Sequence, residues 1–377
     1  MEGLNLQLYQ DLLNEFVANE VKPLAKEIDE TERFPKETVE KMAKMGMLGI
    51  IIPKKYGGAE AGYAPYIDAV RKLSSACATT GVILSAHVSL CCAPIIEFGT
   101  EEQKEKYLPK LATGEYLGAF GLTEPNAGTD ASGQQTTAID MGDHYLLNGN
   151  KIFITNAGYA NVYIVFAMTD KSLGTKGISA FIIESTYEGF SVGKKEEKMG
   201  IRGSSTCELI FKDVRVPKEN LLGKIGEGFK IAMKTLDGGR IGIAAQAQGI
   251  AEGALAETIT YVKARKQFNK PISAFQNTQF TLADMKVRTE ASYLLIQEAV
   301  KAKESGSKEL SVKAAMAKLF AAETASFVTN RAVQLFGGYG YTREYPVERM
   351  MRDAKITEIY EGTSEVQRMV ISSAILK

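Results

Sequence analysis

Residues 162–166 (Val-Tyr-Ile-Val-Phe) and 178–183 (Ile-Ser-Ala-Phe-Ile-Ile) decide the fold class, because β-branched and aromatic residues dominate both segments. Residues 151–155 and 207–211 have a similar composition and are two further candidate strands. Asn148-Gly149, which precedes the first of these, is typical of a two-residue hairpin turn. We therefore expect an all-β domain in the middle of the chain.

The sequence on either side of these strands has helical periodicity. We place an N-terminal α-helical domain at residues 1–117, the middle β domain at 118–223 and a C-terminal helical bundle at 224–377. The small residues of 242–256 would allow close packing, within the bundle or between subunits. One set of apolar residues falls at helical spacing in the C-terminal part: Phe280, Ala283, Val287, Ala291 and Leu294.

Length and charge narrow the classes of function. The chain has 377 residues, 45% of them hydrophobic and 24% charged, which is typical of a globular protein with a substantial core. Lys+Arg and Asp+Glu number 45 each, so we expect no nucleic-acid partner. The only histidines are His87 and His144, and the four cysteines lack C-x-x-C spacing. These counts argue against a metal site and against a Ser-His triad.

Residues 74–96 carry no charge and are long enough to cross a bilayer. Polar residues and Pro94 interrupt this run, so we interpret it as a buried core helix and expect no membrane span. The first residues, Met1-Glu2-Gly3-Leu4-Asn5, lack the basic and apolar regions of a signal peptide. The cysteine pattern indicates a reducing compartment.

A carboxylate near the C-terminus offers the clearest chemistry. Residues 359–367 read Ile-Tyr-Glu-Gly-Thr-Ser-Glu-Val-Gln, and Ser364-x-x-Gln367 fits a capping box at a helix start. Glu361 would then lie beside backbone N–H groups that have no helical partner. This arrangement suits removal of a proton alpha to a carbonyl, because the donors stabilise the oxygen as it gains charge. The alternative is a surface acid that the helix dipole favours.

Four other segments allow both a ligand-binding and a structural interpretation. Residues 121–130 form a turn-rich loop whose N–H groups would approach a phosphate or a flavin edge, or would simply connect two domains. In the basic run 263–268, Arg265 would pair with a pyrophosphate or lie solvated at a helix end. Residues 334–341 contain three glycines that would admit a ligand or stop a helix. Residues 237–240 place an acid and an arginine around two glycines, as a ligand contact or an ion pair. No G-x-G-x-x-G or P-loop motif is present.

Together and in this order, the stretches resemble the acyl-CoA dehydrogenase family over nearly the whole chain, in particular its short-chain, butyryl-CoA dehydrogenase-like branch. Each stretch alone is a weak signal, whereas five in register are specific. The matching stretches are 119–125 (Ala-Phe-Gly-Leu-Thr-Glu-Pro), 153–156 (Phe-Ile-Thr-Asn), 265–268 (Arg-Lys-Gln-Phe), 334–340 (Gln-Leu-Phe-Gly-Gly-Tyr-Gly) and 359–364 (Ile-Tyr-Glu-Gly-Thr-Ser).

The resemblance implies an α+β multidomain fold with an N-terminal helical domain, a middle β-barrel domain and a C-terminal four-helix bundle. It implies a homotetramer, built as a dimer of dimers, with FAD held between the middle and C-terminal domains and a neighbouring subunit closing the site. It also implies an acyl-CoA substrate and an electron-transfer flavoprotein as electron acceptor. The expected location is the bacterial cytoplasm, or the mitochondrial matrix for a processed eukaryotic form.

By the same resemblance, Glu361 removes the alpha proton of a butyryl-CoA-like substrate while the beta hydrogen leaves as hydride to flavin N5, and trans-2-enoyl-CoA results. The backbone N–H of Glu361 and a ribityl hydroxyl would hold the thioester oxygen. Three alternatives stay open: the same site run as an enoyl-CoA reductase, an acyl-CoA oxidase, and a non-catalytic flavoprotein scaffold.

The resemblance also assigns the other site residues. Arg265, Gln276 and residues 334–338 would reach FAD across the subunit boundary. The FAD-binding set would be Phe120, Leu122, Thr123, Gly128, Thr129, Phe153, Ile154, Thr155, Arg265, Gln267, Phe268, Gln276, Gln334, Leu335, Gly337, Gly338, Thr363, Ser364 and Glu365. The acyl-CoA-binding set would be Thr129, Asp237, Gly238, Gly239, Arg240, Tyr360 and Gly362.

Three features refine this resemblance. Many members carry Trp where this chain has Phe153, and the chain contains no Trp. Branched- and long-chain members place their base beside Arg240, where this chain has Gly239, so Glu361 has no rival there. The uncharged segment 74–96, which would form the acyl pocket, offers no cation for a distal carboxylate and argues against a glutaryl-CoA substrate.

Overall fold

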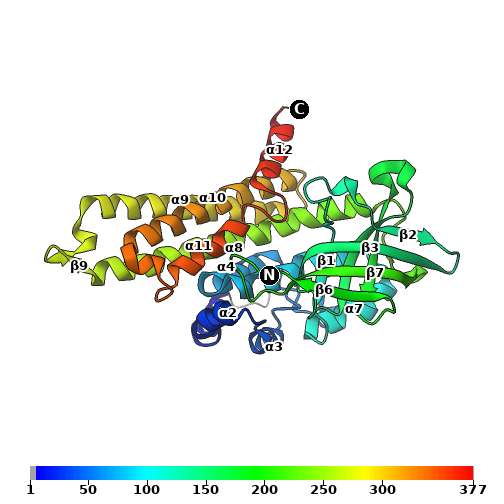
Figure 1. Ribbon diagram of the computed structural model, residues 1–377, viewed down its shortest axis with the longest axis horizontal. Helices are drawn as coiled ribbons and strands as arrows, with labels where there is room; N and C mark the ends of the chain where they lie inside the picture. The colour runs from blue at the N-terminus through cyan, green and yellow to red at the C-terminus, as the bar shows by residue number, and fades with distance from the viewer. Residues whose placement is uncertain (1–5, 377) are drawn as a thin grey trace.

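The computed structural model describes residues 6–376 of an elongated molecule with the large β-sheet at one end of its long axis (Figure 1). Helical N- and C-terminal regions flank this mixed sheet, which confirms the predicted fold class. Residues 1–5, on which the expectation about a signal peptide depends, lie outside the described part.

The N-terminal region is mostly helical up to residue 113. The last of its helices opens with the predicted capping box, in which Gln103 N donates to Thr100 Oγ1 at 3.2 Å and Thr100 N donates to Gln103 Oε1 at 3.0 Å. Its helices are α1 (Leu6–Phe16), α2 (Ala25–Thr31), α3 (Lys36–Lys44), α4 (Tyr63–Ala76), α5 (Ala78–Ser85), the π-helical turn η4 (Ala86–Cys92), α6 (Ala93–Phe98) and α7 (Glu101–Thr113).

The uncharged segment is buried, as the sequence predicts, but it is not one helix. Cys77 has extended backbone, with φ −150°, and separates α4 from α5. Every residue of α5 and η4 is buried. Among the described residues, Ala78–Phe98 is the one helical stretch long and apolar enough to cross a membrane, and 78% of its apolar window is buried inside the protein. This degree of burial inside the protein is that of a core helix.

The middle region forms one mixed sheet in the order β6-β7-β3-β2-β4-β5-β8, with β1 added parallel to β4. Most other neighbours are antiparallel. The strands are β1 (Gly118–Gly121), β2 (Thr137–Asp140), β3 (His144–Thr155), β4 (Val162–Met168), β5 (Ile178–Glu184), β6 (Phe190–Lys195), β7 (Thr206–Pro217) and β8 (Leu221–Leu222).

Strand β4 is buried at every position because both of its faces are covered. Tyr163 and Val165 pack with residues of β3, β5 and β7, whereas Ile164 and Phe166 pack with α7 and the first turn of the C-terminal region. A strand with two covered faces needs no polar alternation. This explains the continuous apolar run of residues 162–166.

The predicted hairpin at Asn148-Gly149 is wrong, because His144–Thr155 is one continuous strand. Gly149 has φ 140° and lies where the pairing of β3 with β7 shifts register. A Cβ at this position would lie 2.5 Å from Thr136 Oγ1. Glycine therefore serves a bulge with a close backbone approach, which the same dipeptide signal does not distinguish from a turn.

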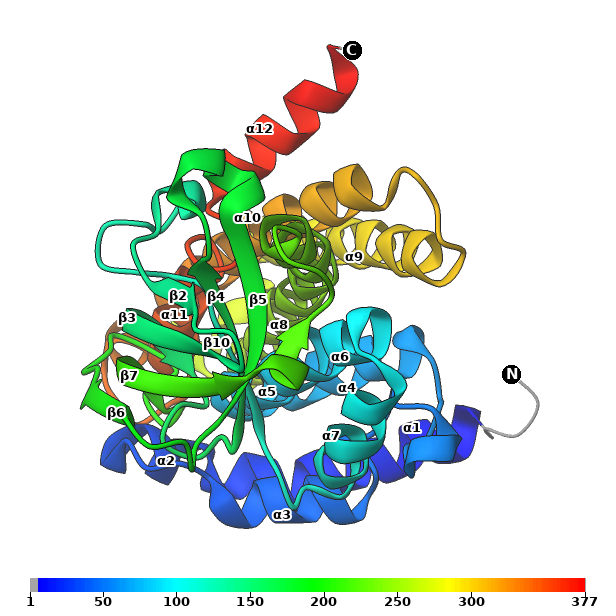
Figure 2. The ribbon, with the colours of Figure 1, turned by 90° about the vertical axis from the view of Figure 1, so that its right-hand side faces the viewer.

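Helix α8 is the centre of the C-terminal region and contacts α4, α9 and α10. In Figure 2 it lies between α9 and α10 on one side and the N-terminal helices on the other. A Cβ at Gly249 would lie 2.1 Å from Arg71 O, and one at Gly253 would lie 2.2 Å from Ser75 O. The small residues of 242–256 thus serve packing within the chain. The elements are α8 (Gly228–Ala264), β9 (Lys266–Gln267), β10 (Lys270–Pro271), α9 (Gln276–Glu304), α10 (Leu310–Phe336), α11 (Val347–Ile356) and α12 (Ser364–Ile375).

The apolar residues predicted on α9 do not face the bundle. Phe280, Val287 and Leu294 are 60%, 67% and 64% exposed. The buried positions of α9 include Met285 and Ile296 instead. Helical periodicity identifies an apolar face but not the surface that covers it, and in the single chain this face is uncovered.

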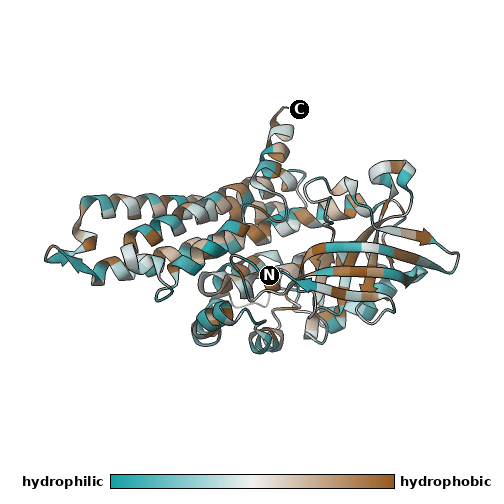
Figure 3. Cartoon of the chain, viewed as in Figure 1, coloured by the Kyte–Doolittle hydropathy of each residue, from teal (hydrophilic) through white to brown (hydrophobic). Residues whose placement is uncertain are grey.

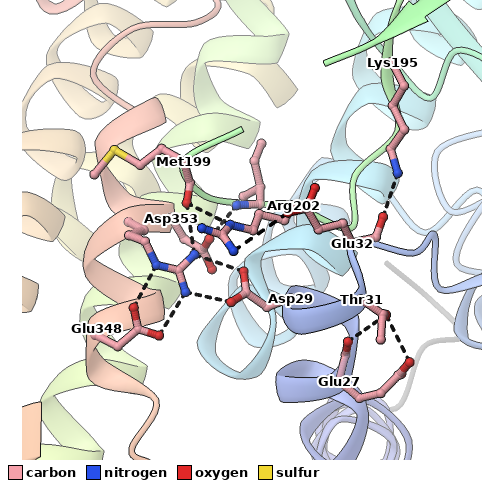
Figure 4. A network of polar contacts seen from close by, with 11 residues as sticks. Glu27, Asp29, Thr31, Glu32, Lys195, Met199, Arg202, Glu348 and Asp353 are labelled. Carbon is pink, nitrogen blue, oxygen red and sulfur yellow. Dashed lines mark hydrogen bonds and ion pairs between the residues drawn. The ribbon is translucent and has the colours of Figure 1, made fainter. Parts of the chain in front are cut away.

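Arg352 of α11 joins the three regions through a polar network that includes Asp29, Met199 and Glu348, which Figure 4 labels. Its guanidinium donates to Asp29 Oδ2 of α2 at 2.6 Å, to Glu348 Oε2 at 2.8 Å and to Met199 O at 3.0 Å. Beside it, Ile201 N donates to Asp353 Oδ1 at 2.5 Å. Helix α11 is therefore fixed to α2 and to the loop before β7, immediately ahead of the turn that carries Glu361.

Candidate active site

Glu361 lies in the short connection between α11 and α12. Its φ is 53° and that of Gly362 is 93°, so two consecutive residues adopt left-handed backbone. For a residue other than glycine this conformation costs roughly 1–2 kcal/mol. It persists only where the surroundings impose it.

Three helices hold this turn in place. The carbonyl oxygen of Gly362 accepts Lys318 Nζ of α10 at 2.6 Å and Gln367 Nε2 of α12 at 2.8 Å. The hydroxyl of Tyr360 is hydrogen-bonded to Gln246 of α8. The residue next to Glu361 on each side is thus tethered, and the position of the carboxylate follows from both tethers.

The predicted capping box at Ser364 is wrong by one residue. Helix α12 begins at Ser364, and its N-cap is Thr363, whose Oγ1 accepts Val366 N at 3.2 Å. The Gln367 side chain donates to the Gly362 carbonyl oxygen rather than returning to the cap. Threonine and serine are both good N-caps, so the sequence does not choose between adjacent positions.

The carboxylate of Glu361 lies against the backbone of α8. A Cβ on Gly239 would be 2.1 Å from Glu361 Oε2 and 2.9 Å from Leu90 Cδ2. The acid therefore fills the space that any side chain at position 239 would occupy. Its Oε2 is buried and, within the described chain, has no hydrogen-bond partner. Leu90 belongs to η4, so the uncharged segment provides an apolar wall beside the acid.

Burial raises the pKa of Glu361 from 4.5 to about 7, and the positive charges of Lys318 and Arg240 oppose this rise. Lys318 is itself fully buried, and burial lowers the pKa of its ammonium to about 8. A carboxyl group that titrates near neutral pH and lacks a partner is suited to accept a proton from a bound molecule.

The backbone N–H of Glu361 is a second unused group at this site. Within residues 6–376 it donates to no acceptor. A carbonyl oxygen of a bound molecule would satisfy this donor while its neighbouring carbon faces the carboxylate. Glu361 therefore offers both an unpaired carboxylate oxygen and an unused N–H donor.

The predicted acyl-CoA residues gather around Glu361, except for Thr129. Asp237 Oδ1 and Arg240 Nη1 form an ion pair of 2.8 Å on α8, and Arg240 is only 5% exposed. The carbonyl oxygen of Gly238 accepts the hydroxyl of Tyr63 at 2.7 Å. Thr129 lies apart, on an exposed loop of the β region.

A second group of predicted residues meets on the β region. The carbonyl oxygen of Thr123, in the loop 121–130, accepts Ile152 N at 2.9 Å, which places the loop beside β3. Phe153 follows at a bulge, with φ 60° and a side chain 59% exposed. A strained backbone that presents an aromatic ring to solvent is typical of a ligand contact.

The other predicted residues of this group differ in exposure. Gly128 lies in the exposed part of the loop, and Phe120 and Thr155 are half-buried. The side chains of Leu122 and Ile154 are buried in the core. Any ligand contact of these two residues would use backbone atoms.

A third group lines a cleft of about 510 Å³ at the end of α8 and α10. The guanidinium of Arg265 lies 5.4 Å from the ring centre of Tyr339 in this cleft. Phe268, 87% exposed, and Gln276 lie nearby in sequence but do not line it. The predicted residues that do line the cleft are Arg265, Gln267, Gln334, Leu335, Gly337 and Gly338.

The cleft and the β group fit the FAD that the sequence resemblance implies. Arg265 offers a planar cation for a pyrophosphate. A Cβ at Gly337 or Gly338 would meet no atom within 4 Å, so the backbone there is open to a ligand. The exposed ring of Phe153 offers a surface for a flavin. Thr363, Ser364 and Glu365 lie at the N-terminus of α12, where the helix dipole favours an anion.

Sequence reasoning missed Lys318, Leu90 and Tyr63. Lys318 is the one charged residue of 314–322 (Ala-Ala-Met-Ala-Lys-Leu-Phe-Ala-Ala). A single lysine on the small, apolar face of a predicted helix was the signal available for it. No comparable signal distinguishes Leu90 within its apolar segment.

Comparison with known proteins agrees with this geometry. Models of the N-terminal, middle and C-terminal domains of acyl-CoA dehydrogenases match residues 5–115, 119–214 and 226–376. The chain is 61% identical over 371 residues to the short-chain specific acyl-CoA dehydrogenase of Clostridium acetobutylicum, with 98% of each protein covered. It is 47% identical over 372 residues to the caffeyl-CoA reductase-Etf complex subunit CarC of Acetobacterium woodii, again with 98% of each covered.

The solved structure of butyryl-CoA dehydrogenase from Megasphaera elsdenii superposes with a TM-score of 0.97 at 54% identity and covers 98% of both chains. Three domain models in the expected order and near-complete alignments leave no region of the described chain with a different fold. The chain therefore belongs to the acyl-CoA dehydrogenase family of FAD-dependent oxidoreductases.

Proposed function

We propose that the protein converts a short-chain acyl-CoA, butyryl-CoA or a near relative, to the trans-2-enoyl-CoA with Glu361 as the base. One observation carries this proposal: the Glu361 carboxylate is buried against Gly239 and Leu90, has an unpaired Oε2 and has a pKa raised to about 7 by burial. The names of the Clostridium and Megasphaera relatives support the short-chain substrate class.

Removal of the alpha proton requires charge stabilisation, because the carbon is a very weak acid. The free N–H of Glu361 would donate to the thioester oxygen while the carboxylate of the same residue takes the proton. Arg240 and Lys318 add positive charge to the surroundings without contacting the carboxylate. FAD, when bound, supplies the acceptor for the beta hydrogen.

The packing beyond Gly239 supports a short acyl chain. One turn further along α8, a Cβ on Gly242 would lie 2.4 Å from Ser85 Oγ and 2.8 Å from the hydroxyl oxygen of Tyr66. Helix α8 is therefore in direct contact with α4 and α5 at that level. Little length is left between these helices for an acyl tail that starts at Glu361.

We also propose that a second copy of the chain completes each FAD site, within a homotetramer. The β9 hairpin next to Arg265 is hydrophilic and lies at the opposite end of the molecule from the β3 strand that carries Phe153 (Figures 1 and 3). One FAD contacting both would need two chains. The exposed face of α9 and the 63% exposed Met369 on the projecting helix α12 supply apolar surface for such contacts.

For the electron acceptor we propose an electron-transfer flavoprotein, which the name of the Etf complex that contains CarC supports. We propose the bacterial cytoplasm as the location, because the Clostridium, Megasphaera and Acetobacterium proteins are bacterial.

The base assignment is tested by the Glu361→Gln variant. Addition of butyryl-CoA to the oxygen-free, FAD-loaded wild-type protein should bleach the flavin absorbance. In the variant the rate should fall by at least about 10³-fold, because an amide cannot accept the proton. Glu323→Gln, which removes an acid of α10 paired with Arg368 at the surface, is the control and should bleach normally. Normal bleaching in Glu361→Gln would contradict the assignment.

Enoyl-CoA reduction at the same site is the second candidate, because CarC is named as a reductase subunit. Reduced protein mixed anaerobically with crotonyl-CoA would regain its flavin absorbance in either case, so the ratio of the two rates decides. A faster reaction from the enoyl-CoA side would favour the reductase. Release of peroxide during turnover in air would identify an oxidase instead.

A further inference from the structure

We propose that Lys318 is a positioning residue for the reaction: it fixes the turn that carries Glu361 and supplies the charge that favours the ionised carboxylate before this group accepts the proton. The inference rests on the proposed role of Glu361 as the base. It adds a residue of the bundle core that would contact neither the acyl-CoA nor FAD.

Lys318 is buried without a carboxylate in contact. It is 0% exposed on α10, and its Nζ donates to Gly362 O at 2.6 Å. Within the described residues, no ion pair of 4.0 Å or less includes Lys318. Removing an ammonium from water costs several kcal/mol, which a contacting carboxylate usually offsets. Because no carboxylate contacts the Lys318 ammonium, we infer that this buried charge has another role.

The first effect is geometric. Gly362 O belongs to the peptide that joins Gly362 to Thr363, one residue beyond Glu361, and only Lys318 Nζ and Gln367 Nε2 donate to it among the described residues. Loss of the lysine would remove one of the two hydrogen bonds to Gly362 O, next to Glu361, whose φ of 53° is intrinsically unfavourable for a residue other than glycine. The carboxylate would then be free to leave its place against Gly239.

The second effect is electrostatic and depends on every charge near the site. The groups that face Glu361 come from α4, α8, α10 and its own turn: Tyr63, Tyr66, Arg240, Lys318 and Tyr360. The groups that face Lys318 are Glu358, Glu361 and Glu365, with Arg240 as the like charge.

Of the two cations that face Glu361, Arg240 is already paired with Asp237 at 2.8 Å. Lys318 is the cation whose charge no contacting carboxylate cancels. Its charge is the largest influence that lowers the pKa of Glu361 against the rise due to burial. Burial lowers the pKa of Lys318, and the negative charges of Glu361, Glu358 and Glu365 oppose this fall and favour the charged lysine.

The test is the pH dependence of Glu361 in the FAD-loaded protein with and without Lys318. Lys318→Met keeps the length and removes the charge and the donor. Isotope-edited infrared titration without substrate reports the carboxyl band, which is assigned by its loss in Glu361→Gln. We expect the titration midpoint to rise by about one pH unit or more, and flavin reduction by butyryl-CoA at pH 7 to fall at least about tenfold.

Two further variants separate charge from packing. Lys318→Arg should restore most of the midpoint, whereas Lys318→Gln, which keeps an N–H donor without the charge, should behave like Lys318→Met. The Gln variant also answers the question if the Met variant does not fold. Lys313→Met removes a part-exposed lysine from the same helix and should change neither readout.

A folded, FAD-loaded Lys318→Met or Lys318→Gln protein with a wild-type midpoint would overturn the inference. The failure of the proposed function looks different. In that case Glu361→Gln would still bleach with butyryl-CoA, whatever the Lys318 variants do.

Discussion

The protein buries two lysines near glutamates, and the two arrangements differ in one contact. In the β region, Lys151 Nζ lies 2.7 Å from Glu124 Oε1. In the bundle, Lys318 Nζ instead meets the carbonyl oxygen of Gly362, and Glu361 Oε2 has no partner among residues 6–376. Both lysines are fully buried, and burial lowers the pKa of each to about 8. The pKa of the Glu124 carboxyl group is lowered, whereas that of Glu361 is raised.

The direct contact between Lys151 and Glu124 is a structural ion pair. Glu124 also accepts Thr136 N at 3.0 Å, and Lys151 also binds Leu122 O at 3.1 Å. Although burial acts to raise the pKa of Glu124, the charge of Lys151 and these hydrogen bonds bring it below its usual value. The contact therefore favours the ionised acid, which holds the loop 121–130 on β3. Separation of the charges in the bundle leaves the pKa of Glu361 near 7 and the acid free to react.

The largest effect on the free energy of unfolding should come from removing the Lys151–Glu124 ion pair. Lys151→Met leaves Glu124 buried without its cation and should lower the free energy of unfolding by about 3–5 kcal/mol. Lys318→Met should lower it by only about 1–2 kcal/mol, because one hydrogen bond is lost and no carboxylate is left in contact. Urea unfolding of the FAD-loaded proteins measures both. The double variant Lys151→Met/Glu124→Leu should recover part of the loss, and equal losses in the two single variants would contradict the comparison.

The next effect concerns stability against pH. The folded pKa of Glu361 is raised, so the native state binds more protons than the unfolded state between pH 4.5 and 7. The contribution of Glu361 to the free energy of unfolding therefore decreases as the pH rises through that window. Glu361→Gln should therefore be more stable than wild type at pH 8, by on the order of 1–3 kcal/mol, with little difference at pH 4.5. Melting temperatures at the two pH values test this.

Glu124→Gln should show the opposite sign. The folded pKa of Glu124 is lowered, so its contribution is present above the unfolded pKa and is lost as the solution becomes acidic. The variant should be less stable than wild type at pH 8. The same sign in both variants would show that the two acids do not differ as their contacts indicate.

The smallest effect should come from the space beside the base. In Gly239→Ala the new methyl group would lie 2.1 Å from Glu361 Oε2 and must displace it, so flavin reduction should slow about tenfold, or about 1.4 kcal/mol in barrier. Gly238→Ala is the comparison variant and should slow the reduction less, because its methyl group would approach the Tyr63 hydroxyl to 3.0 Å and would not displace the carboxylate. Stopped-flow bleaching by butyryl-CoA ranks the two variants.

Much of the fold could be predicted because its signals are local. The apolar runs at 162–166 and 178–183 are buried strands, and Thr100 with Gln103 forms the capping box. Two local signals failed for physical reasons. Asn148-Gly149 serves a bulge, and Thr363 competes successfully with Ser364 as the N-cap.

The candidate site was harder to predict, because its parts come from distant segments. The order of the motifs along the sequence identified Glu361 and the glycines of α8, but it did not show that Glu361 contacts Gly239. The contact depends on the absence of a Cβ at Gly239, which only packing reveals. Lys318 escaped because a lysine on a helix is usually solvated. The apolar face of α9 was found, but periodicity does not show that the single chain leaves this face exposed.

The network around Arg352 gives remote positions influence over turnover. Asp29 precedes Arg352 by 323 residues and belongs to a helix that contributes nothing to the reaction itself, yet it anchors α11, from which the Glu361 turn emerges. A substitution at this distant acid would loosen α11 and, through it, the turn at Glu361, while every residue next to Glu361 stays the same. The position of Glu361 therefore depends on residues far from it in sequence.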